Sequence, residues 1–137
     1  MQKLNIKIEK ALKENPITVE NGKIVPHLFE RFPGFDGGDV PKDYIVYAEM
    51  PELPGAMHGL SYYKYEFTIY SGSNIFKIQK QLRSALKNVT TEFDKFTEIV
   101  AENRYGVCDP TLGVHVRTLV FGILDEDDVD EQLEEGH

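Results

Sequence analysis

The segment from Tyr62 to Leu86, YYKYEFTIYSGSNIFKIQKQLRSAL, changes its hydrophobic period part-way along. Up to Tyr70 apolar and polar side chains alternate, which is the period of a strand with one buried face. After SGSN the apolar residues recur every three or four positions, as in an amphipathic helix. The pattern predicts a strand, a tight turn and a helix that folds back onto its sheet.

The apolar faces of this strand and this helix are predicted to pack against each other, because each can be covered by the other. Ser71 or Ser73 is expected to cap the helix by accepting a hydrogen bond from a free backbone amide. Residues on the buried strand face are Tyr63, Tyr65, Phe67 and Ile69, and those on the helix stripe are Ile75, Ile78, Leu82, Ala85 and Leu86.

The N-terminal part of the chain predicts a second helix and several short extended pieces. Leu4, Ile8, Ala11 and Leu12 lie on one helical face. Pro16 ends this helix, since the residue before a proline avoids the helical region. Beyond it, the Asn-Gly pair at 21–22 favours a turn, and KIVPHLFERF indicates short extended segments interrupted by a proline.

Two segments rich in proline and glycine are interpreted as long, mobile loops. They are Pro33–Asp43, PGFDGGDVPKD, and Pro51–Leu60, PELPGAMHGL. Between them Tyr44–Met50, YIVYAEM, predicts a strand that is either buried on both faces or central in the sheet. Because connections in small domains are usually about 4–6 residues long, loops of this length are often functional.

The C-terminal part predicts a hairpin and then a tail. FTEIVAENRYGV and GVHVRTLVFGILD are two strand-like runs joined by the turn residues Asp109, Pro110 and Gly113. The predicted order is helix, two strands, helix, two strands. This is an α+β domain over residues 1–124, with a mostly antiparallel sheet and two helices on one face.

The charge is unevenly distributed along the 137 residues, whose formal net charge is −8. The segment 125–137, DEDDVDEQLEEGH, holds eight of the 23 acidic residues and no Lys or Arg, so residues 1–124 are neutral. We interpret 125–137 as a flexible, disordered acidic tail. The alternative is that it lies near DNA or a basic partner and tunes their association.

Signatures of catalysis, cofactor binding and metal binding are missing from the sequence. The four histidines lie at no spacing typical of zinc ligands, and GFDGGD lacks the lysine of a phosphate loop. Asp36 and Asp39 could bind a cation, but turn chemistry is favoured. Cys108, the only cysteine, could be a nucleophile, but a packed thiol is favoured, and one cysteine fits a reducing compartment. We therefore predict no enzyme and no cofactor.

Nucleic-acid and membrane binding are also disfavoured. The neutral body has no basic stripe to neutralise phosphates, and no apolar run reaches the roughly 20 residues needed to cross a bilayer. Tyr62, Tyr63 and Tyr65 could stack on bases, but alternate aromatic residues on a strand are more often core.

The order of these segments resembles the tail-completion or tail-terminator proteins of long-tailed bacteriophages and related prophages. The likeness covers roughly residues 3–124: an N-terminal helix, the YIVYAE strand, the YEFTIYSGSNIFKIQKQLRSAL unit and a final hairpin, RYGVCDPTLGVHVRTLVFGI. Residues that match the family's pattern are Leu82 to Leu86, Arg104 with Asp109, and Arg117 with Leu119 and Phe121.

This resemblance implies a structural virion protein, assembled in the host cytoplasm and located at the tail or neck. Six copies would form a ring that caps the tail tube, meeting the major tail protein on one side and the head connector or stopper protein on the other. The isolated protein is expected to be a monomer or a weak oligomer. DNA would pass through the ring without specific binding. The competing interpretation is a small intracellular α+β module that binds a protein or a ligand on the same sheet; an enzyme comes third.

The assembly surface of such a ring subunit is expected in mobile loops and in the last hairpin, where subunits can meet. Arg104 and Asp109 flank a turn closely enough to form a salt bridge within one chain. The alternative is that the same charges form contacts between subunits. The candidate assembly residues are Asp36, Asp39, Glu52, His58, Arg104, Asp109 and Arg117.

Overall fold

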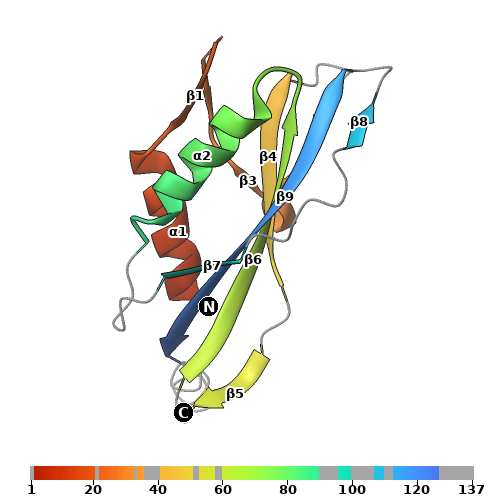
Figure 1. The fold of residues 1–137 in the computed structure, drawn as a ribbon. Coiled ribbons are helices and arrows are strands. Elements are labelled where there is room, and N and C mark those ends of the chain that lie inside the picture. The colour runs from red at the N-terminus through yellow and green to blue at the C-terminus, as the bar shows by residue number, and fades with distance from the viewer. Residues whose placement is uncertain are drawn as a thin grey trace.

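Two long antiparallel strands form the centre of the structure, and the α-helices α1 and α2 lie on one side of them (Figure 1). The computed structural model describes residues 2–20, 22–32, 34–35, 41–50, 53–57, 60–89, 96–99, 107–109 and 113–126. The elements are α1 (Gln2–Glu14), β1 (Ile17–Val19), β2 (Gly22–Ile24), β3 (His27–Leu28), the 3-10 helix η1 (Phe29–Arg31), β4 (Asp43–Glu49), β5 (Leu53–Met57), β6 (Leu60–Ser71), α2 (Ile75–Leu86), β7 (Phe96–Ile99), β8 (Val107–Asp109) and β9 (Val114–Glu126).

The main sheet is built around β6 and β9, which pair along their length from Leu60↔Glu126 to Ser71↔His115. β4 and β5 both pair with β6, while β7 and β8 both pair with β9. β3 adds to β4 in parallel, and every other pairing in the sheet is antiparallel. The predicted α+β class with a mostly antiparallel sheet is therefore confirmed.

The core lies between the helices and one face of the sheet. The side chains predicted to alternate inward on β6, and the predicted stripes of α1 and α2, all lie in one buried cluster. Leu119, Phe121 and Ile123 of β9 complete its floor. The strand and helix periods of the sequence thus predicted the core correctly. Tyr63 and Tyr65 are buried in this core, so they cannot stack on bases.

A small hairpin of β1 and β2 is fastened to α2. Ile17 and Ile24 are buried in the core, and the Gln81 side chain hydrogen-bonds the backbone of Thr18 in both directions. The Thr18 amide donates to Gln81 Oε1 at 2.8 Å, and Gln81 Nε2 donates to the Thr18 carbonyl at 2.9 Å. Gln81 therefore satisfies the backbone amide and carbonyl of Thr18, as a neighbouring strand would.

Four local expectations are corrected by the structure. Pro51–Leu60 is not a loop throughout, because Leu53–Met57 forms β5 on β6 with a register shift. The cap of α2 is Asn74, whose Oδ1 accepts from the Lys77 amide at 3.1 Å, and not Ser71 or Ser73. The described residues of the strand-like run before the last turn form β7 and β8, and with β1, β2, β3 and β5 the described order is longer than four strands. β9 continues to Glu126, two residues into the predicted tail, whose remainder lies outside the described residues.

Candidate functional site

One face of the sheet is left open by the helices, and it forms the candidate functional surface. Helical packing covers Ile45 and Tyr47 of β4, whereas the alternate residues Tyr44, Val46 and Ala48 are only half-buried. β4 is central in the sheet, as predicted, but it is not buried on both faces. An apolar strand face without a covering layer is the kind of surface that proteins use for association.

A continuous row of aromatic rings runs across this open face. Tyr44 stacks on Tyr70 across the β4–β6 pair, with ring centroids 4.5 Å apart, and Phe35 meets the Tyr44 ring edge-on at 4.9 Å. Phe35 in turn contacts Phe32 at 5.0 Å, and Phe32 stacks on His27 at 5.0 Å. Stacked and edge-to-face pairs of this kind contribute about 0.5–1.5 kcal/mol each beyond the area that they bury, so the rings support one another's positions.

The aromatic row borders a groove of about 550 Å³. Its charged lining residues are Glu49 and Glu66, and no Lys, Arg or His is among the described residues that line it. Phe29, at the start of η1, lies at the groove with 64% of its surface exposed. The other lining residues are Phe32, Tyr44, Val46, Tyr47, Ala48, Met50, Thr68 and Tyr70. We call this feature the aromatic groove.

The exposed side of α2 has the opposite charge. Lys77, Lys80 and Lys87 are exposed, Arg83 is half-buried, and no acidic residue occurs from Ile75 to Lys87. Phe76 is 65% exposed at the start of the same helix. The Arg117 guanidinium of β9 lies over the Phe76 ring, 4.3 Å from its centroid, and a cation–π contact of this kind keeps the ring in place at the surface.

A polar cluster closes the turn between β6 and α2. The Asp43 carboxylate accepts hydrogen bonds from the hydroxyls of Ser71 at 2.6 Å and Ser73 at 2.7 Å. The Ser73 amide donates to Ser71 Oγ at 3.1 Å, and Gly72 donates to the Lys42 carbonyl at 2.9 Å. Both hydroxyls donate to the same carboxylate, so the cluster holds the turn after β6 against the start of β4.

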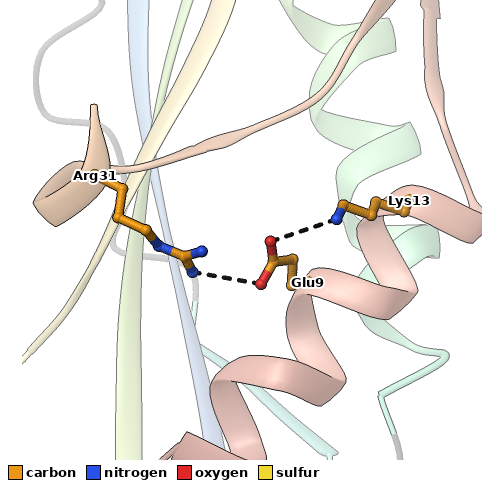
Figure 2. A network of polar contacts seen from close by, with 3 residues as sticks. All are labelled: Glu9, Lys13 and Arg31. Atoms are coloured by element: carbon orange, nitrogen blue, oxygen red, sulfur yellow. Dashed lines mark hydrogen bonds and ion pairs between the residues drawn. The ribbon is translucent and has the colours of Figure 1, made fainter. Parts of the chain in front are cut away.

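A second polar network, shown in Figure 2, joins α1 to the segment that carries the aromatic groove. The Glu9 carboxylate of α1 lies 3.5 Å from Lys13 Nζ and 3.3 Å from the Arg31 guanidinium of η1. These three side chains and Tyr47 are among the residues around a smaller hollow of about 170 Å³. Exposed pairs of this type contribute under about 1 kcal/mol each, so the network ties η1 to α1 with a small gain in stability.

The pKa of the Tyr47 phenol is shifted by its burial and by two charges of this network. Burial raises the pKa of its phenol above the ordinary value of 10.0, the Glu9 carboxylate raises it further, and Arg31 opposes the shift. The folded state therefore holds the phenolic proton more tightly than the unfolded state does. The contribution of the protonated phenol to the free energy of unfolding is fully present below pH 10. It is lost as the pH rises through the higher pKa of the folded state.

We expect Tyr47→Phe to flatten the alkaline decline in stability, because phenylalanine has no proton to lose. The free energy of unfolding, measured by urea titration at pH 8, 10 and 11, should fall less steeply above pH 10 in the variant than in the wild type. Parallel curves would show that the Tyr47 phenol ionises equally well in both states.

The residues predicted from sequence to form the assembly surface are only partly described. Asp36, Asp39, Glu52, His58 and Arg104 lie outside the described residues, and so does the predicted Arg104–Asp109 pair. Asp109 is the last residue of β8 and pairs with Val114. Arg117 is bound within its own chain, because it stacks on Phe76 and its Nη1 donates to Gln79 Oε1 at 3.4 Å.

Sequence reasoning missed the aromatic groove. The residues that could have indicated it lie in YIVYAE and KYEFTIY. There Tyr44, Val46, Thr68 and Tyr70 alternate with the core residues and face away from the core. An apolar residue at such a position is ambiguous until the covering layer is known. The helices cover one face, and that arrangement turns Tyr44, Val46 and Tyr70 into a surface.

Within the described part of the chain, no group of three or more His, Cys, Asp or Glu residues could hold a metal ion. The described helices also include none that is long and apolar enough to cross a membrane. Comparison with known proteins yields no match to a protein family, to a curated protein or to a solved structure.

Proposed function

We propose that this protein is a structural subunit of a phage tail, which caps the tail tube as a ring and joins the tail to the head connector. The observation that carries the proposal is the aromatic groove on a sheet face that neither α1 nor α2 covers. A protein that works by assembly needs a rigid body and a preformed apolar surface for its neighbours.

The aromatic row supplies such a surface. Tyr44, Tyr70 and Phe35 are held by contacts with one another, so little conformational entropy is lost when they meet a partner. Aromatic residues are enriched at the centres of protein interfaces for this reason. The resemblance of residues 3–124 to tail-terminator proteins supports the same class of function.

Deletion of the gene from a phage or prophage that carries it tests the proposal. We expect filled heads and separate tails of abnormal length, because an uncapped tube neither stops growing correctly nor binds the connector. Complementation with the intact gene should restore normal virions. Normal virions from the deletion strain would end the proposal.

The second candidate is a binding module for a small molecule, and the size of the aromatic groove favours it. A volume of about 550 Å³ lies within the 300–1,000 Å³ typical of ligand pockets. Aromatic ligands would raise the melting temperature of the isolated protein in a thermal-shift screen if this candidate is correct. A ring subunit should instead respond to purified tail tubes, seen as an increase in mass by light scattering.

A further inference from the structure

We propose that the aromatic groove of one copy receives the exposed face of α2 from a second copy. This inference rests on the proposed function and deepens it, because it names the two surfaces through which the ring would form. The surfaces are the groove around Glu66 and the face of α2 that carries Phe76, Lys77 and Lys80.

Charge complementarity identifies the occupant. Glu66 lines the groove together with Glu49, which has an interaction of its own within the chain, and no described basic residue lines it. The residues from Ile75 to Lys87, by contrast, carry only basic charges. Among the described residues, neither the Glu66 carboxylate nor the Lys80 ammonium has a hydrogen bond or ion pair within the chain. Within the described part of the chain, neither charge is thus neutralised by a partner. The acidic segment 127–137 is a poor occupant, because its charge would repel both glutamates.

Apolar complementarity agrees with the charges. Phe76 is an exposed aromatic side chain on a basic helix, and the groove is an aromatic and aliphatic hollow with an acidic lining. An aromatic anchor that enters a pocket, with charged pairs around it, is the usual centre of a protein interface. Arg117 covers one side of the Phe76 ring and fixes its position before binding.

The positions of the two surfaces determine what kind of assembly forms. α2 packs on one face of the sheet (Figure 1). The groove is lined by residues of the other face, among them Tyr44, Val46 and Thr68, so the two surfaces of one chain cannot meet. A contact between two different surfaces of identical subunits is heterologous. Each copy then keeps one free groove and one free helix face, and repetition gives a closed ring or an open filament.

Reversal of one charge at a time tests the contact directly. Glu66→Lys and Lys80→Glu should each weaken self-association about tenfold or more, because like charges would face each other. An equimolar mixture of the two variants should recover association, since each groove can then meet a helix of opposite charge. Sedimentation velocity over a concentration series measures the effect, and circular dichroism checks that each variant is folded. A mixture no better than its components would overturn the proposal.

Zero-length cross-linking makes even a weak contact visible. A carbodiimide joins a carboxylate to an amine only when they are in contact, and a mixture of 14N- and 15N-labelled wild-type protein distinguishes links between copies from links within one. We expect mixed-isotope peptides that join Glu66 to Lys77 or Lys80, and their loss in Glu66→Gln. The absence of any mixed-isotope link between the groove and α2 would overturn the proposal.

The interface and the tail-cap function can be tested separately. If no cross-link joins the groove to α2 but the deletion strain makes abnormal tails, the interface is wrong and the tail-cap function remains. A positive cross-link together with normal virions from the deletion strain would retain the interface and remove the function.

Discussion

Leu82→Ala is expected to destabilise the protein by about 2–5 kcal/mol, the range measured for large-to-small changes at buried leucines. Leu82 is 0% exposed and lies in the cluster that joins α2 to the inner face of the sheet. Its removal would forfeit apolar burial and leave a cavity, because the surrounding β6 side chains are fixed by the strand. Urea denaturation monitored by circular dichroism measures the loss.

Ser84→Ala is the matched control for this change. Ser84 is exposed on the same helix, two residues away, so its replacement should alter stability by no more than about 0.5 kcal/mol. The comparison separates packing from helix propensity, since both variants place alanine in α2. A loss under about 0.5 kcal/mol for Leu82→Ala would mean that the helix presents a different face to the sheet.

Asp43→Ala is expected to cost about 1.5–3 kcal/mol, the range for hydrogen bonds to a charged group. The carboxylate accepts from Ser71 Oγ and Ser73 Oγ, and Ser71 is 0% exposed. Without Asp43, the Ser71 hydroxyl would be buried with no acceptor at that position, which is costlier than the loss of an exposed bond. The effect is measured by the same urea titration.

Asp43→Asn separates the hydrogen bonds from the charge. Its side-chain oxygen can still accept from both hydroxyls, so we expect a smaller loss than with alanine. Because Asp43 ties the start of β4 to the end of β6, amide exchange in the turn at Gly72 should increase more in Asp43→Ala than in Asp43→Asn. Equal losses for the two variants would show that the negative charge, and not the acceptor atom, stabilises the turn.

The inner layer of this protein could be predicted from sequence because its signals are local. β6 alternates over adjacent residues and α2 repeats over one or two turns, so each period is complete within a short window. The N-terminal helix ends at Glu14, before Pro16, for an equally local reason. The acceptor that caps α2 was misplaced because Ser71, Ser73 and Asn74 are all competent caps, and the local sequence does not rank them.

The candidate site could not be predicted in the same way, because it depends on contacts between distant residues. Tyr44 and Tyr70 become neighbours only through the register of β4 on β6, and β5 forms only because β6 extends far enough to pair with it. Which face of a sheet is covered is decided by where the helices pack, and no window of sequence contains that information. The apolar periods of the chain therefore specify the elements and the core, whereas strand register and helix placement create the aromatic groove and set the basic face of α2 on the opposite side of the sheet.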